Sequence, residues 1–208
     1  MGPHEATVLV DCCSTAGTRT PTSSAGSTGR ESPALSAATT PKSPWLVGRL
    51  DFELPNVGAG PDPLSLAAFA TDHDAIVLLF QRDYHCGNCK AQLKDVAERY
   101  DEFTERSVAV VSILPEPKAR AREWQDSFAL PFPLLADPDA DVGEQYDQPT
   151  RFGVLGELHD LVGRMPQTVV LDTRDDALDA HSIHEGDSPS NRPSIDAMLG
   201  ELDDLFAA

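Results

Sequence analysis

The sequence predicts an α/β domain with a central, mainly parallel sheet that helices cover on both faces. Two continuous apolar runs rich in Ile and Val, Ala75–Phe80 and Ser107–Ile113, are typical of strands buried on both faces. Amphipathic helical patterns follow both runs, and strands that alternate with helices favour parallel pairing. A later strand, Met165–Asp172, precedes a polar turn and a shorter strand, Leu178–Ile183. This pattern predicts an antiparallel hairpin, so the sheet as a whole should be mixed.

The charge balance of the chain is strongly acidic. Its 208 residues contain 34 Asp and Glu against 16 Lys and Arg, which gives a formal net charge of −18. Such a charge opposes binding to nucleic acid and to anionic membranes. Arginine supplies most of the positive charge, and we expect the acidic, lysine-poor surface of a protein that stays soluble in a high-salt cytoplasm.

The first part of the chain differs in composition from the rest. Residues 1–45 are rich in Ser, Thr, Gly, Pro and Ala and cannot bury enough apolar surface to offset the entropy of ordering. They predict a disordered low-complexity tail, which contains Cys12 and Cys13, ahead of one domain over 46–208. The apolar stretch Ala6–Val10 is too short for the core of a signal peptide, and we expect a cytoplasmic protein without a membrane span.

The predicted domain opens with a short strand and continues into the first buried strand and a helix. Asp51–Pro55 alternates apolar and polar residues and ends at a proline, which predicts an edge strand. A turn cluster, Gly58–Pro63, follows it. After the strand Ala75–Phe80, one helical stripe predicts a helix that runs on to Phe103. Its members recur at helical spacing: Leu93, Val96, Ala97, Tyr100 and Phe103.

The second half of the domain has shorter elements. A second helix is marked by an apolar stripe that includes Trp124, and an extended piece, Phe132–Leu135, leads to a helical turn that ends near Tyr146. Residues 147–163 contain three glycines and predict connecting structure. Pro193 suits the first position of the last helix. That helix has its own apolar stripe: Ile195, Met198, Leu199, Leu202, Leu205 and Phe206.

The candidate reactive residues lie in the sequence Cys86-Gly-Asn-Cys89, between the first predicted buried strand and the helix that follows it. Unpaired N–H groups and the helix dipole favour a thiolate at a helix start, and such sites bring the pKa of a cysteine down to roughly 3.5–7.5. Cys89 lies about one turn further along the same face. The spacing predicts a redox-active disulfide in which Cys86 is the attacking thiolate and Cys89 resolves the mixed disulfide.

Two other interpretations of the cysteine pair stay open. Half of a zinc site would need two more ligands, but there is no second C-x-x-C, and His73, His85 and His159 are not at ligand spacing. The cysteines could also be inert and buried. His85 could lower the pKa of Cys86 when protonated, or be a surface ring. Dithiol chemistry implies no metal ion and no organic cofactor.

Three segments resemble the alkyl hydroperoxide reductase C/thiol-specific antioxidant group of thioredoxin-fold redoxins. They are Asp51–Asn56, Cys86–Lys90 and Met165–Asp172, and the resemblance covers about Leu50 to Phe206. It implies a thioredoxin-like fold, with a central mixed sheet flanked by helices and an N-terminal strand extension. It also implies that Pro166 lies against the cysteine pair and that the main chain of Met165 pairs with an extended substrate segment.

Two activities of that group compete. The peroxiredoxin motif P-x-x-x-T-x-x-C would make Cys89 the peroxidatic cysteine, but Arg82 and Cys86 occupy the proline and threonine positions. Pro166 stands where an arginine is expected, and Arg82 or Arg164 could supply that charge instead. These departures favour thiol–disulfide exchange through Cys86, with an antioxidant role, over peroxide reduction at Cys89. A third hypothesis is that the chain is a non-catalytic redox-sensing binding module.

The expected partners follow from this chemistry. The substrate would be a protein or small-molecule disulfide, or a hydroperoxide. Electrons would come from a dithiol protein or a low-molecular-weight thiol.

Overall fold

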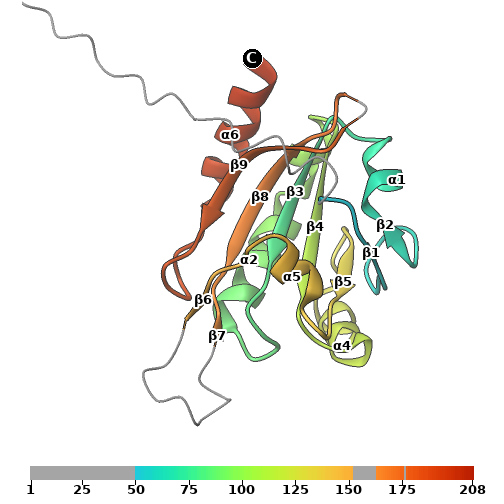
Figure 1. The fold of residues 1–208 in the computed structure, drawn as a ribbon, viewed down its shortest axis with the longest axis vertical. Coiled ribbons are helices and arrows are strands. Elements are labelled where there is room, and N and C mark those ends of the chain that lie inside the picture. The colour runs from blue at the N-terminus through green and yellow to red at the C-terminus, as the bar shows by residue number, and fades with distance from the viewer. Residues whose placement is uncertain (1–49, 152–162, 176) are drawn as a thin grey trace, which may run out of the picture. The chain divides into compact units, whose positions relative to one another are not determined.

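The structure is a computed structural model that describes residues 50–151, 163–175 and 177–208, all within one unit that spans Lys42–Ala208 (Figure 1). The predicted disordered tail, with Cys12 and Cys13, lies outside the described residues. Most of the predicted connection at 147–163 does as well.

A five-stranded mixed sheet forms the centre, in the order β5-β4-β3-β8-β9 (Figure 1). Its strands are β3 (Ala75–Phe80), β4 (Val108–Leu114), β5 (Leu134–Ala136), β8 (Gln167–Asp172) and β9 (Asp179–Glu185). β3, β4 and β5 pair in parallel, whereas β8 pairs antiparallel with both β3 and β9. The predicted parallel strands and the closing hairpin are both confirmed.

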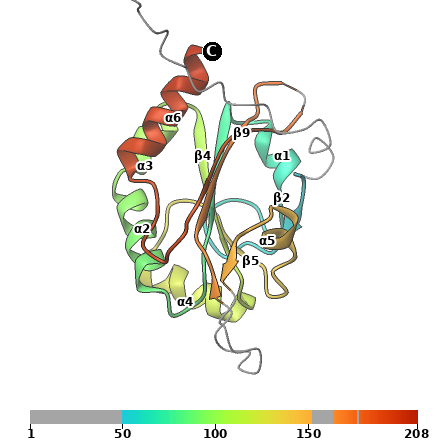
Figure 2. The ribbon, with the colours of Figure 1, turned by 60° about the vertical axis from the view of Figure 1, so that its left-hand side comes forward.

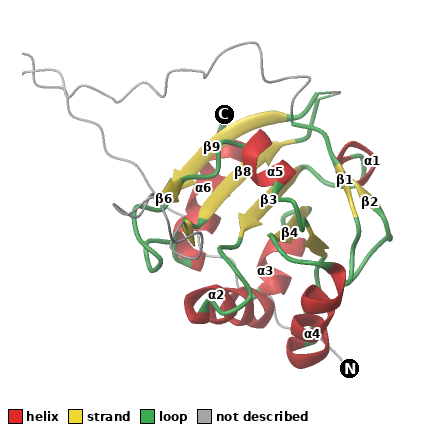
Figure 3. Cartoon of the chain, turned by 60° about the horizontal axis from the view of Figure 1, so that its bottom comes forward, coloured by secondary structure: helices red, strands yellow, loops and turns green. Residues whose placement is uncertain are grey.

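Helices cover both faces of this sheet (Figures 2 and 3). They are α1 (Leu66–Ala70), α2 (Gly87–Glu98), α3 (Tyr100–Thr104), α4 (Lys118–Phe128), α5 (Asp141–Gln145) and α6 (Ile195–Ala207). Side chains alternate along β3, so Val77 and Leu79 pack among α2, α3, α4 and α6, whereas Leu78 and Phe80 pack on the side of α1 and α5. None of these helices is long and apolar enough to cross a membrane.

Two helix boundaries differ from the prediction. The helix expected to run on to Phe103 is interrupted at Arg99, whose N–H donates to the carbonyl of Val96 and whose guanidinium binds Glu102. α6 begins after Ser194, whose side chain accepts the N–H of Ala197, so Pro193 lies just outside the helix. A serine at the N-cap satisfies a free N–H of the first turn, which proline at the first position does not do.

The opening strand is an edge strand, as predicted, and it belongs to a separate two-stranded sheet rather than to the central one. β1 (Glu53–Leu54) pairs antiparallel with β2 (Leu64–Ser65) in a separate two-stranded sheet. Another short pair, β6 (Thr150–Arg151) with β7 (Gly163–Arg164), also stands apart from the central sheet. Asn56, just beyond β1, makes a bridge to Leu135 of β5.

The side chain of Asn56 fastens this N-terminal extension to the central sheet. Its Nδ2 donates to the carbonyls of Ala59 and Pro61 at 2.8 and 2.9 Å. Its Oδ1 accepts the N–H of Gly58 at 2.8 Å and that of Leu134 at 3.1 Å. Asn56 is 2% exposed, so its side-chain amide is shielded from water, and its bond from Leu134 is buried at both ends.

Replacing Asn56 with alanine is therefore expected to lower the free energy of unfolding by roughly 2–4 kcal/mol, because four main-chain groups, among them the buried N–H of Leu134, lose their partner. Urea denaturation followed by circular dichroism measures this. Thr71→Ala, which removes a hydroxyl that bonds the Ala68 carbonyl at an exposed site, is the control and should change stability by less than about 0.5 kcal/mol. Equal midpoints for the two variants would contradict the role given to Asn56.

Candidate redox site

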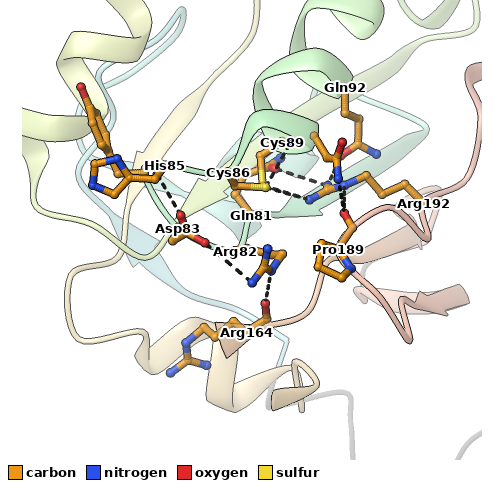
Figure 4. Close-up of a disulfide and its surroundings, with 12 residues drawn as sticks. Gln81, Arg82, Asp83, His85, Cys86, Cys89, Gln92, Arg164, Pro189 and Arg192 are labelled. Atoms are coloured by element: carbon orange, nitrogen blue, oxygen red, sulfur yellow. Dashed lines mark hydrogen bonds and ion pairs between the residues drawn. A yellow bond between two sulfur atoms is a disulfide. The ribbon is translucent and has the colours of Figure 1, made fainter. Parts of the chain in front are cut away.

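Cys86 and Cys89 form a disulfide at the N-terminus of α2, at the end of the loop that leaves β3 (Figure 4). Their Cα atoms are 5.2 Å apart. Cys86 is the N-cap residue, and its Sγ accepts the N–H of Cys89 at 3.1 Å. Cys86 is 6% exposed and Cys89 is fully buried. A thiolate on Cys86 would therefore face the free N–H groups of the first helical turn.

The loop before the pair is held by its own hydrogen bonds. Asp83 accepts the N–H of His85 at its carboxylate (2.8 Å) and that of Cys86 at its carbonyl (3.3 Å). The N–H of Tyr84 donates to the carboxylate of Glu116 at 3.0 Å. The imidazole of His85 is exposed and packs edge-on against the ring of Tyr84, rather than on a sulfur.

A third residue, Arg192, reaches the two sulfurs from the segment between β9 and α6 (Figure 4). Its Nη2 lies 2.9 Å from the Sγ of Cys89 and 3.7 Å from that of Cys86. Its Nη1 donates to the Oε1 of Gln92 at 2.5 Å and lies 3.5 Å from that of Gln81. Arg192 lies 106 positions from Cys86, and no motif in the sequence links it to the cysteine pair.

The guanidinium of Arg192 is poorly compensated. No carboxylate among the described ranges forms an ion pair with it. Burial, and secondarily the charge of Arg82, lower the pKa of Arg192 to about 10. In the disulfide state the sulfurs beside it are neutral. A thiolate on either cysteine would supply the missing negative charge, so Arg192 favours the reduced pair.

Hydrogen bonds to α2 and to β9 hold the segment that carries Arg192 in place. The side chain of Asn88, inside the C-x-x-C, donates to the carbonyl of Pro189 at 3.3 Å. Asn191 donates to Asp187 at 2.7 Å and contacts the ring of His184 of β9 at 3.0 Å. These contacts hold the segment across the disulfide.

The other two arginines proposed from the sequence do not donate to the sulfurs. Arg82 donates through Nε to the carbonyl of Arg164 at 2.7 Å, and its Nη2 lies 4.0 Å from Asp83. Arg164 faces Glu144 at 3.5 Å, and its Nη1 has no hydrogen-bond partner among the described residues. Arg192, and neither of these two, lies against the sulfurs.

Met165 and Pro166 are buried where the chain enters β8. The N–H of Met165 donates to the carbonyl of Pro149 at 2.7 Å, and its own carbonyl accepts from Gln148 at 2.8 Å. The carbonyl of Pro166 accepts the N–H of Gly186 at 2.8 Å, and the bond between Met165 and Pro166 is trans. Both main-chain groups of Met165 are thus paired within the chain, and the substrate-binding role of these residues stays a prediction.

In the part of the chain that the structure describes, no group of three or more His, Cys, Asp or Glu side chains is arranged to hold a metal ion. The chemistry available at the site is that of two thiols, one guanidinium and two buried amides, Gln81 and Gln92.

Comparison with known proteins gives consistent results. Residues 49–176 match the model of the AhpC/TSA family. A protein of Mycobacterium tuberculosis that carries the name "Putative peroxiredoxin" is 29% identical over 98 residues, which is 47% of this chain and 58% of that protein. This chain thus aligns with less than two thirds of the length of the curated relatives that it matches.

Solved structures of peroxiredoxins share the fold. Peroxidoxin BcpB of Mycobacterium tuberculosis superposes with a TM-score of 0.60 at 24% identity, over 74% of this chain and 93% of that chain. The bacterioferritin comigratory protein of Xanthomonas campestris gives a TM-score of 0.62 at 15% identity, over 74% and 91% of the two chains. Because these identities are low, the likeness supports the thioredoxin-like fold and no particular reaction.

Proposed function

Because this chain belongs to the AhpC/TSA family, we propose that it is a thiol-dependent antioxidant oxidoreductase that works through the dithiol Cys86 and Cys89. The observation that carries the proposal is the Cys86–Cys89 disulfide at a helix start, with Arg192 against both sulfurs. These features favour a thiolate and hold a second sulfur within bonding distance of the first.

In the reaction that we favour, the thiolate of Cys86 attacks a disulfide substrate. One new S–S bond forms between Cys86 and the substrate, the substrate's own S–S bond breaks, and one thiolate leaves and takes a proton from water. Cys89 then attacks the sulfur of Cys86 and releases the second thiolate. The substrate gains two electrons, and the pair ends as the Cys86–Cys89 disulfide.

Cys86 is the better candidate for the attacking thiol in this reaction. It sits at the N-cap of α2 and keeps 6% exposure, whereas Cys89 is fully buried. The incoming disulfide must reach the attacking sulfur, but the resolving sulfur needs only to reach its neighbour. We further propose that Met165 and Pro166 shape the substrate groove.

The partners that this function requires are of two kinds. The oxidised partner is a protein or small-molecule disulfide, or a hydroperoxide. The reduced partner is a dithiol protein or a low-molecular-weight thiol that restores the pair. Neither half-reaction needs a metal ion or an organic cofactor.

Peroxide reduction at Cys89 is the second candidate, and Arg192 is the observation that favours it. The guanidinium lies 2.9 Å from the Sγ of Cys89 and is closer to it than to that of Cys86. It could therefore supply the positive charge that the family motif expects at the position of Pro166. The Cys89 thiolate would attack one peroxide oxygen, the O–O bond would break, and the other oxygen would leave protonated. Cys86 would then attack the sulfenic acid on Cys89 and release water.

Two single-cysteine variants separate these reactions. If exchange starts at Cys86, Cys89→Ser should trap a stable mixed disulfide between Cys86 and a protein disulfide substrate, visible by mass spectrometry. If Cys89 is peroxidatic, Cys86→Ser should form a sulfenic acid on Cys89 within milliseconds to seconds of mixing with hydrogen peroxide, visible by stopped-flow fluorescence and a sulfenic-acid probe.

The two measurements should be made side by side, in low and in high salt. A trapped adduct without rapid oxidation of Cys89 supports exchange, and the reverse supports peroxide reduction. A pair that cycles between dithiol and disulfide but turns over neither substrate would identify the chain as a redox-sensing module and overturn both enzymatic proposals.

A further inference from the structure

A cavity of about 460 Å³ lies beside the redox pair, between α2 and the segment from Ser190 to Asp196. Gln92 and Arg192 belong to its lining, and so do the acidic side chains of Asp95 and Glu98 on the outer face of α2. Asn88, inside the C-x-x-C, also lines this cavity, and the guanidinium of Arg192 contacts both sulfurs, so the cavity lies next to the disulfide.

Gln92 lines the cavity and carries an unused donor. The residue is 7% exposed, and its Oε1 accepts a hydrogen bond from Arg192 at 2.5 Å. This bond fixes the amide so that Nε2 is a separate donor, and Nε2 has no hydrogen-bond partner among the described residues. A buried donor without a partner is costly, so this atom points to a ligand with an acceptor group.

Arg192 strengthens the case for an anionic acceptor. It has no carboxylate partner in the described ranges, and its contacts with the carbonyl of Pro189 and with Gln81 are long, at 3.4 and 3.5 Å. A carboxylate could replace these weak contacts with charge-assisted hydrogen bonds. The guanidinium and the free amide of Gln92 therefore form the two donors expected for a ligand carboxylate.

The outer part of the cavity has the opposite charge. Asp95 and Glu98 are exposed, and neither forms an ion pair with any described residue, whereas Asp196 is bound by Arg99 at 2.7 Å. Two free carboxylates at the mouth of the cavity suit an ammonium group. The cavity thus has hydrogen-bond donors for a carboxylate in its inner part and carboxylates for an ammonium group in its outer part. This arrangement is complementary to a small zwitterion.

We propose that this cavity binds a low-molecular-weight thiol with an amino-acid head group, and that this thiol reduces the Cys86–Cys89 disulfide. The ligand carboxylate binds Arg192 and Gln92, and its ammonium group lies near Asp95 and Glu98. The inference rests on the proposed function, because it names the reductant class of the same cysteine pair.

The reduction balances with two thiols. The first thiolate attacks the Sγ of Cys86, the bond to Cys89 breaks, and Cys89 leaves as a thiolate beside Arg192. A second thiolate attacks the outer sulfur of the mixed disulfide, releasing the oxidised dimer of the small thiol and the Cys86 thiolate. Two electrons pass from the two thiols to the protein disulfide, and protons from the thiols balance the charge.

The test measures the rate at which four thiols reduce the disulfide of the full chain. Cysteine has both head-group charges, cysteamine has only the ammonium, 3-mercaptopropionate has only the carboxylate, and 2-mercaptoethanol has neither. Rates are compared at equal thiolate concentration and divided by the rate of each thiol with 2-hydroxyethyl disulfide, which removes differences in intrinsic nucleophilicity. We expect cysteine to be roughly tenfold faster than 2-mercaptoethanol, with the other two between them.

Variants of the cavity should remove this advantage. Gln92→Leu removes the free donor, together with the acceptor of the Arg192 bond, at similar volume, and the double variant Asp95→Asn, Glu98→Gln removes the acidic mouth. Both should bring cysteine close to 2-mercaptoethanol. Asp101→Asn, an exposed acid outside the cavity, removes one negative charge and should keep the full preference.

A second readout does not depend on turnover. S-methyl-L-cysteine cannot react, but it should shift the NMR signals of the Gln92 side-chain amide in the wild-type protein and not in the double variant, so the test survives if Gln92→Leu fails to fold. Equal corrected rates for all four thiols, or no S-methyl-L-cysteine binding, would overturn the inference and leave the proposed function standing. A pair that no thiol or dithiol reduces would instead overturn the proposed function.

Discussion

Replacing Cys86 with serine is expected to lower turnover in the reduction of a protein disulfide such as insulin by about a thousandfold or more. A serine hydroxyl at the N-cap of α2 cannot form the mixed disulfide, and it is a far weaker nucleophile than a thiolate. The fold should persist, because serine is itself a good N-cap residue and can accept the N–H of Cys89 in place of sulfur.

The control for this prediction removes two other cysteines. Cys12→Ser combined with Cys13→Ser changes a part of the chain outside the described residues and should leave turnover with insulin within about twofold of wild type. Circular dichroism and urea denaturation should show that Cys86→Ser is folded. Unchanged turnover in folded Cys86→Ser would rule out exchange through this thiol.

The central sheet could be predicted because its signals are local in the sequence. Ala75–Phe80 is apolar at every position, and the structure buries all six of its residues between two layers of helices. The hairpin of β8 and β9 follows from two strand patterns joined by polar turn residues. Cys86 could be placed at a helix start for the same reason, since strand, loop and helix follow each other directly.

Features that depend on distant contacts could not be predicted. The apolar helix stripe does not predict the break at Arg99. At the break Arg99 forms ion pairs with Glu102 and with Asp196, which lies 97 residues from Arg99 in the sequence. Similarly, Asp51–Pro55 has the alternation of a strand, but alternation does not say which strand becomes the partner. The pairing with Leu64–Ser65 depends on how the turn between them closes.

Arg192 is the clearest example at the site. In the sequence it stands in a polar loop of Ser, Pro and Asn before a helix, and nothing near it resembles a thiol site. Only the fold brings it against cysteines more than a hundred residues earlier. The family motif directed attention to Pro166, because arginine is expected there, whereas the guanidinium comes from another segment.

Arg192 is expected to set the reduction potential of the cysteine pair. Arg192→Met should shift the reduction potential of the Cys86–Cys89 pair by about 30–60 mV in the negative direction. Loss of one charge-assisted hydrogen bond to a thiolate removes about 1.5–3 kcal/mol from the reduced state, and for a two-electron couple 30 mV corresponds to about 1.4 kcal/mol. The disulfide state should not suffer equally, because there the cation has no negative partner among the described residues. Removing the cation should also raise the pKa of the more acidic thiol.

Equilibration with a glutathione redox buffer measures the potential, and the thiolate absorbance at 240 nm measures the thiol titration. Arg192→Lys keeps the charge but loses the planar group that reaches Cys89 and Gln92 together, so its potential should lie between those of Arg192→Met and the wild type. If Arg192 acted only through packing, Arg192→Met and Arg192→Lys would change the stability to denaturant. Their reduction potentials would then not follow the charge of the side chain at position 192. An unchanged potential in folded Arg192→Met would mean that the guanidinium does not stabilise a thiolate, and peroxide reduction at Cys89 would lose the observation that favours it.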